Sequence, residues 1–241
     1  MYGDDYPRDA TPFSFVTVPE LRWLATSLHL SDGDRFVDLA CGRGGPGLWV
    51  ARATGAALIG IDSSVAAILA AARLTRQSDG APLFVVADAA ASGLRADSVE
   101  AVMSVDALQL IPHRNAVLGE VARVLKPGGR FAFTTWLSRS GRATVPFPVD
   151  YRPLLSAVGL SFEACHEPPD WQPRESAVFA GIRLTAASLR AECGEEVAGM
   201  LVAEAERMPE VLPLIWRVNV RATKPANRAP QPASGAQVER E

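Results

Sequence analysis

A glycine-rich turn between an apolar run and a helical pattern constrains the fold of this chain more than any other feature. The turn lies in the segment FVDLACGRGGPG, residues 36–47, where the apolar run ends at Asp38. Residues 48–53 have a helical pattern, so strand, turn and helix open a βαβ unit. Glycines let the backbone approach a ligand, and Asp62, which ends the next apolar run, can accept hydrogen bonds from ribose hydroxyls. These features predict a site for a nucleoside-containing cofactor.

Further apolar runs alternate with helical patterns along the chain, which is typical of a parallel sheet covered on both faces. The predicted strands comprise residues 36–40, 57–61, 83–87, 98–105, 130–136, 160–166 and 214–221. Four aspartates stand at strand ends, namely Asp38, Asp62, Asp88 and Asp106. Ligands of such sheets bind beyond the carboxyl ends of the strands, so we expect these four acids along one binding edge.

Composition places the chain among folded proteins of a single α/β domain, with 241 residues of which 48% are hydrophobic. A net charge of -3 gives no general attraction to nucleic acid. The three cysteines are scattered, which predicts neither a metal site nor a disulfide framework. The acidic N-terminus is unlike a signal peptide, and no apolar run is long enough to span a membrane. We therefore expect a cytoplasmic protein.

The expected domain covers residues 1–224, and a disordered tail rich in proline and alanine follows over residues 225–241. The segments outside the sheet are expected to form a lid that selects the substrate; they are residues 1–17, 137–150 and 172–213. Within and around these segments we expect helices over residues 150–159, 177–184 and 186–208, and a stiff turn at residues 168–173.

Two classes of cofactor compete for the glycine-rich turn. Gly42, Gly44 and Gly47 satisfy the G-x-G-x-x-G pattern of dinucleotide-binding proteins, so an NAD-dependent oxidoreductase is one interpretation. Asp38 would repel a pyrophosphate, however, and Pro46 removes an N–H that would hold one. A further carboxylate at the third strand end suits the exocyclic amine of a base. The acids favour a ligand with an amine and a sulfonium and without phosphate.

Four segments carry a resemblance to a known family. They are VDLACGRGG at residues 37–45, GIDSS at 60–64, ADA at 87–89 and EVARVLKPGG at 120–129. In this order they resemble successive motifs of the class I S-adenosylmethionine-dependent methyltransferases, in particular the bacterial branch that acts on small molecules such as secondary metabolites. The resemblance covers roughly residues 35–136. It implies a Rossmann-like, doubly wound sheet of seven strands, mostly parallel with an antiparallel last strand.

The resemblance also implies which residues hold the methionine part of S-adenosylmethionine. Gly42 and Gly44 would pass under it, Asp38 would lie near its amino group, and Val105 would line the sulfonium side. The family usually has glycine where this chain has Ala40, and a methyl group there tightens the turn without excluding the cofactor.

For the nucleoside part, the resemblance implies four positions. Asp62 would take the ribose hydroxyls, Ser63 would lie beside the adenine, and Asp88 with Ala89 would bind the adenine edge. We expect the same edge of the sheet to receive a hydrophobic small molecule, because the lid segments are rich in apolar and aromatic residues.

A catalytic base is less clear from the sequence. Many relatives carry a histidine followed by a Pro-Asp pair after the fourth strand, where this chain has Leu110 and then Pro112-His113. The remaining candidates are Asp106 and His166, with turn capping and surface exposure as the respective alternatives. Methyl transfer needs mainly alignment, so a base is optional. The missing histidine motivates an alternative function, in which the fold catalyses a non-methylating reaction such as a cyclisation.

Overall fold

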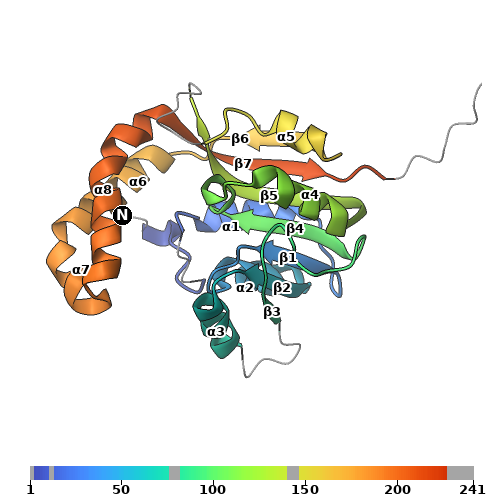
Figure 1. Ribbon diagram of the computed structural model, residues 1–241, viewed down its shortest axis with the longest axis horizontal. Helices are drawn as coiled ribbons and strands as arrows, with labels where there is room; N and C mark the ends of the chain where they lie inside the picture. Colours follow the sequence, from blue (N-terminus) through green and yellow to red (C-terminus); the bar gives the residue numbers. More distant parts are fainter. Residues whose placement is uncertain (1–2, 11–13, 76–81, 140–146, 227–241) are drawn as a thin grey trace, which may run out of the picture.

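A single seven-stranded sheet forms the centre of the computed structural model, which describes residues 3–10, 14–75, 82–139 and 147–226 (Figure 1). The strand order is β3-β2-β1-β4-β5-β7-β6. The strands are β1 (Arg35–Leu39), β2 (Ala57–Asp62), β3 (Leu83–Val86), β4 (Val99–Val105), β5 (Leu125–Ser138), β6 (Ser161–His166) and β7 (Ile215–Thr223). β1 pairs in parallel with β2 and β4, whereas β7 is antiparallel to β5 and β6. This confirms the predicted sheet.

Helices cover both faces of the sheet (Figure 1). They are α1 (Val18–Ser27), α2 (Gly45–Thr54), α3 (Val65–Leu74), α4 (Arg114–Val124), α5 (Arg152–Ala157), α6 (Trp171–Leu184), α7 (Ala186–Cys193) and α8 (Glu195–Val211), with 3-10 turns η1 (Gly3–Asp5), η2 (Leu108–Leu110) and η3 (Leu212–Leu214). Leu24 of α1 and Val50 of α2 are buried in one cluster against β1. Val121 of α4 and Leu155 of α5 are buried in another, against β5. The two clusters are the two sides of the core.

Helix α1 begins with a capping box. Thr17 accepts a hydrogen bond from the backbone N–H of Glu20, and the Glu20 carboxylate accepts one from the Thr17 N–H at 2.9 Å. Pro19 stands in the first turn, where its missing N–H costs nothing. The helix ends before His29, which has a positive φ of 51°. The capping box also holds Glu20 in a buried position, from which it contacts Arg217 of β7.

Three helices lie between β6 and β7, where the sequence predicted two. The predicted turn at residues 168–173 was wrong for residues 171–173, which belong to α6. Helix α6 begins at Trp171, because Pro173 falls in its first turn, where no N–H is required. Gly194, with a φ of 85°, separates α7 from α8. Helix α8 also continues past Pro209. The Ala205 carbonyl, which Pro209 cannot pair with, accepts a hydrogen bond from Arg183 Nη1 at 2.5 Å.

Helices α6, α7 and α8 lie together beyond the ends of the strands, on one side of the sheet (Figure 1). Trp136 near the end of β5 is buried with Phe179 of α6 and Met208 of α8, which attaches these helices to the carboxyl ends of the parallel strands. Within the described ranges, no helix is long and apolar enough to cross a membrane. The predicted disordered tail lies almost entirely outside the described residues, as does the centre of the predicted lid segment 137–150.

Candidate active site

The glycine-rich turn follows β1 directly and leads into α2. Ala40, Gly42 and Gly44 all have positive φ values, of 58°, 53° and 79°. A Cβ added at Gly42 would meet nothing within 4 Å, so this glycine faces open space in a cavity. A Cβ at Gly44 would lie 2.7 Å from the Phe84 ring. Gly44, expected beneath the cofactor, therefore faces the protein interior, and packing explains why it is glycine.

Asp62 stands between two cavities and is held by two backbone amides. Its Oδ2 accepts a hydrogen bond from the Gly42 N–H, and its Oδ1 accepts one from the Ser64 N–H, both at 2.8 Å. One carboxylate therefore fixes the glycine-rich turn and the start of α3 in the same geometry. Because each carboxylate oxygen can accept more than one hydrogen bond, both oxygens retain acceptor capacity.

The first cavity, which we call the Asp88 cavity, has a volume of about 340 Å³. It brings together the expected nucleoside-binding residues; these are Asp62, Ser63, Asp88 and Ala89. The Asp88 carboxylate accepts a hydrogen bond from the Ala90 N–H at 2.7 Å through Oδ1. That bond holds the side chain at the cavity wall, in position to accept from an exocyclic amine.

The second cavity, the Asp38 cavity, lies on the other side of Asp62 and has a volume of about 300 Å³. It brings together the expected methionine-side residues; these are Asp38, Ala40, Gly42 and Val105. Ser14 of the N-terminal segment also lines it. Ala40 and Asp62 line both cavities, so the two spaces adjoin at the glycine-rich turn.

Asp38 is the buried carboxylate of this second cavity. Only 1% of the residue is exposed, and within the described chain neither of its oxygens has a hydrogen-bond partner of good geometry. Burial raises the pKa of Asp38 to about 7, the nearby N–H of Gly47 offsets part of this rise, and the charge of Asp62 adds to it. A cationic group in the cavity would pair with this carboxylate and stabilise its ionised form.

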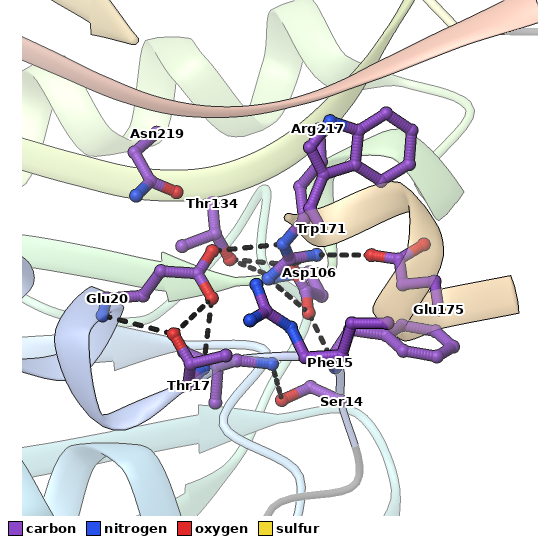
Figure 2. A network of polar contacts seen from close by, with 12 residues as sticks. Ser14, Phe15, Thr17, Glu20, Asp106, Thr134, Trp171, Glu175, Arg217 and Asn219 are labelled. Atoms are coloured by element: carbon purple, nitrogen blue, oxygen red, sulfur yellow. Dashed lines mark hydrogen bonds and ion pairs between the residues drawn. The ribbon is translucent and has the colours of Figure 1, made fainter. Parts of the chain in front are cut away.

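Asp106, one of the two candidate bases, is an anchor in this structure. Its carboxylate accepts hydrogen bonds from the Phe15 N–H at 2.9 Å and from Thr134 Oγ1 at 2.6 Å. Arg217 adds a hydrogen bond at 3.0 Å and an ion pair at 2.8 Å (Figure 2). Asp106 lines the Asp38 cavity, but these contacts occupy its lone pairs.

The same arginine collects two more carboxylates. Arg217 Nε donates to Glu20 Oε1 at 2.9 Å, and Nη1 lies 3.5 Å from Glu175 Oε1 (Figure 2). All of these side chains are buried. Sequence reasoning missed this cluster, because its members come from α1, the turn after β4, α6 and β7.

His166, the other candidate base, lies at the end of β6, the outermost strand on its side of the sheet. Its ring contacts Trp23 with centroids 4.9 Å apart, and Nε2 lies 3.3 Å from Asn219 Nδ2. Burial lowers the pKa of His166. It lines neither of the two cavities around Asp62, and two strands separate it from β4. The structure therefore does not bring His166 to the predicted cofactor residues.

A third cavity, the Met208 cavity, lies beside the first two and has a volume of about 490 Å³. Its walls are mainly apolar and include Trp136, Phe147 and Met208. Polar groups come from Gln109 and Arg114 near η2 and from Glu204 and Arg207 on α8. Sequence reasoning placed α8 in the lid without naming these residues. Their signal was the amphipathic pattern of α8, which buries Ala205 and Met208 and leaves the alternate face polar.

No metal site accompanies these cavities in the described part of the chain. No three or more histidine, cysteine, aspartate or glutamate side chains there come together in a way that could hold a metal ion.

Comparisons with known proteins find methyltransferases among the relatives of this chain. Residues 37–133 match the model of the family described as "Methyltransferase domain". Methyltransferase GfsG of Streptomyces halstedii is 37% identical over 108 residues, which cover 44% of this chain and 38% of the relative. Sterol 24-C-methyltransferase ERG6A of Gibberella zeae is 30% identical over 132 residues, covering 52% of this chain and 34% of the relative. The chain thus spans little more than a third of the length of these curated relatives.

Solved structures show the same fold. The [4+2]-cyclase SpnF superposes with a TM-score of 0.75 at 22% identity, covering 86% of this chain and 80% of that one. Geranyl diphosphate C-methyltransferase from Streptomyces coelicolor superposes with a TM-score of 0.63 at 18% identity, covering 86% and 80%. At these identities the superpositions show the fold alone. The family match covers residues 37–133, the stretch that carries all four motifs.

Proposed function

We propose that this chain is an S-adenosylmethionine-dependent methyltransferase acting on an apolar small molecule. The observation that carries the proposal is the position of Asp62, fixed by two amides at the wall shared by the Asp88 and Asp38 cavities. The family match over residues 37–133 and the methyltransferase names of the relatives support the same activity. Secondary metabolites are one class of acceptor that would suit the apolar Met208 cavity.

The residues of the two cavities fit the proposed cofactor. Asp38 is a buried carboxylate without a hydrogen-bond partner among the described residues, which suits the ammonium of the methionine part. Gly42 leaves room for a ligand where a side chain would project. Asp62 would accept from the ribose hydroxyls and Asp88 from the adenine amine. Bound S-adenosylmethionine would supply a methyl group on a good leaving group.

The remaining parts of the chain would hold the acceptor and exclude water. Ser14 lines the Asp38 cavity, and the Ala10 carbonyl occupies the space where a Cβ of Gly45 would stand, so the N-terminal segment packs directly on the glycine-rich turn. Helix α8 lines the Met208 cavity. We propose that these segments form the lid that closes over both ligands, in a single domain spanning residues 1–224.

The test is the affinity for S-adenosylhomocysteine, measured by titration calorimetry. We expect Asp62→Ala to weaken binding by about ten- to hundredfold, because it removes charge-assisted hydrogen bonds to the ribose. Asp62→Asn keeps the size of the side chain and one acceptor oxygen, so it should weaken binding less than Asp62→Ala. Asp32→Ala is the matched control, because Asp32 is an exposed aspartate in the turn before β1, outside the cavities and the proposed lid. Equal affinities for wild type and Asp62→Ala would contradict the proposal.

A non-methylating reaction such as a cyclisation is the second candidate. The observation in its favour concerns Asp106, the candidate base. Its carboxylate is fully engaged in the buried cluster and is therefore not available to take a proton from a methyl acceptor. Incubation with S-adenosylmethionine and a small-molecule extract distinguishes the two, because only methyl transfer releases S-adenosylhomocysteine in step with product. In a thermal-shift assay, NADH stabilising the protein more than S-adenosylhomocysteine would instead indicate an oxidoreductase.

A further inference from the structure

Leu110 lies where the three cavities meet. It lines the Asp88 cavity, the Asp38 cavity and the Met208 cavity. Its side chain is nonetheless 70% exposed, which is high for a large apolar residue inside a cleft. A leucine held in the open between three ligand-sized spaces is covered only when those spaces are filled.

The turn that carries Leu110 is held firmly. Arg114 donates to the Leu108 carbonyl at 2.9 Å through Nε and to the Gln109 carbonyl at 2.7 Å through Nη2. The buried Gln109 side chain donates to the Asp106 carbonyl and accepts from Thr135 Oγ1 at 3.0 Å. Side chains therefore fix the backbone immediately before Leu110. Its exposed position is built into the η2 turn.

Apolar residues line much of the Met208 cavity around Leu110, and they include Pro112, Trp136 and Val211. Arg114 also lines this cavity, and the other charged side chains, Glu204 and Arg207, come from the exposed face of α8. The carboxylate nearest in the chain, Asp106, is taken up by Arg217. A ligand in this cavity thus meets carbon at Leu110, and meets charge at Arg114 and along the α8 wall.

We propose that Leu110 is a specificity-determining residue that contacts both the cofactor and the methyl acceptor, and that it selects acceptors with an uncharged, apolar framework around the reacting atom. This inference rests on the proposed function. Any polar group of the acceptor points away from Leu110, toward Glu204 and Arg207. Gln109 and Arg114 also act as positioning residues, because their side chains hold the turn that carries Leu110.

The experiment uses a pair of fluorescent probes with the same carbon framework. N-phenyl-1-naphthylamine is neutral, and 8-anilinonaphthalene-1-sulfonate carries an added sulfonate. Each is titrated into the full chain with and without S-adenosylhomocysteine, and fluorescence gives the dissociation constant. We expect the neutral probe to bind at least about tenfold more tightly than the sulfonate. S-adenosylhomocysteine should strengthen binding of the neutral probe by about fivefold or more, because both ligands share the Leu110 surface.

Leu110→Asn should weaken the neutral probe by about tenfold and remove its coupling to S-adenosylhomocysteine, since burial of a leucine side chain accounts for such a factor. Leu110→Met, which stays apolar, should keep both the affinity for the neutral probe and its coupling to S-adenosylhomocysteine. Leu184→Asn is the matched control, because Leu184 is 87% exposed and lines none of the three cavities.

Equal behaviour of Leu110→Asn and Leu184→Asn would overturn the inference, as would tighter binding of the sulfonate or no binding of the neutral probe to wild type. These results leave the proposed function standing as long as S-adenosylhomocysteine binds and Asp62→Ala weakens it. Failure of wild type to bind S-adenosylhomocysteine is a different result, and it would contradict the proposed function itself.

Discussion

Arg217 Nη1 lies 2.8 Å from Asp106 Oδ1, and both side chains are buried (Figure 2). This pair joins β7 to the turn after β4, two elements that β5 separates in the sheet. Through Glu20 and Glu175 the same guanidinium also reaches α1 and α6. One cation therefore faces three carboxylates at the point where the N-terminal segment and α6 meet the sheet.

Removing the cation should be costly. We expect Arg217→Met to lower the free energy of unfolding by about 3–5 kcal/mol, because it leaves buried carboxylates without their partner. Urea unfolding followed by circular dichroism measures the change. Arg190→Met is the matched control, since Arg190 pairs with Glu195 at the exposed end of α7 and such pairs contribute about 0–1 kcal/mol. Similar unfolding energies for the two variants would show that the buried cluster adds nothing to stability.

Glu175 should make stability fall as pH rises. Burial raises the pKa of Glu175 to about 8, against an ordinary value of 4.5, so the folded state holds its proton where the unfolded state has lost it. The contribution is fully present below pH 4.5 and is lost between pH 4.5 and 8, at about 1.4 kcal/mol per pH unit at most.

Glu175→Gln isolates this effect, because glutamine keeps the shape of the protonated acid at every pH. Relative to wild type, the variant should gain stability steadily from pH 5 to pH 8, as measured by urea unfolding at several pH values. Glu196→Gln, at an exposed position in the first turn of α8, is the control and should show no such trend. Parallel stability curves for wild type and Glu175→Gln would contradict the expected titration.

The sheet and half of the site follow from local sequence patterns. Apolar runs ending in Asp62 and Asp88 predict two parallel strands with acids at one edge, and the structure brings both to the same cavity. This works because the carboxyl ends of parallel strands meet at one edge whatever the helices do. The same logic placed Asp38 and Asp106 at that edge, where both line one cavity.

The roles of individual acids and bases depended on partners far away in the chain. Nothing near Asp106 in the sequence reveals Arg217, which lies 111 positions later and arrives through the antiparallel β7. His166 was predicted to face the cleft because it stands at the end of a strand. The insertion of β7 between β5 and β6 moves that end to the outside of the sheet. Long-range pairing decided both outcomes, and periodicity carries no information about it.

Asp38 should link cofactor binding to pH. Because its pKa is about 7 without ligand, the carboxylate is partly protonated at neutral pH. An ammonium group in the Asp38 cavity favours the ionised form, so binding of S-adenosylhomocysteine should release a proton near pH 7. Affinity should therefore rise from pH 6 to pH 8. Calorimetry in two buffers of different ionisation enthalpy measures the proton directly.

Asp38→Asn serves as the comparison for this linkage. The variant has no proton to release, so the dependence on buffer and on pH should disappear while S-adenosylhomocysteine still binds, more weakly. Since the raised pKa also makes stability fall as pH rises through 7, Asp38→Asn should be relatively more stable at pH 8 than at pH 5. Proton release that persists in Asp38→Asn would assign the effect to another group.

Ala40 offers a test of strain at the turn. It is a non-glycine residue with a φ of 58°, a conformation that costs about 1–2 kcal/mol with a Cβ present. Glycine removes that cost but adds about 0.5–1 kcal/mol of backbone entropy on folding, so Ala40→Gly should stabilise the fold by up to about 1 kcal/mol. Ala90→Gly, at a cavity position without a positive φ, meets only the entropic cost and should destabilise. Thermal unfolding of the two variants gives the sign of each change, and a loss of stability in Ala40→Gly would mean that the methyl group makes packing contacts worth more than the strain.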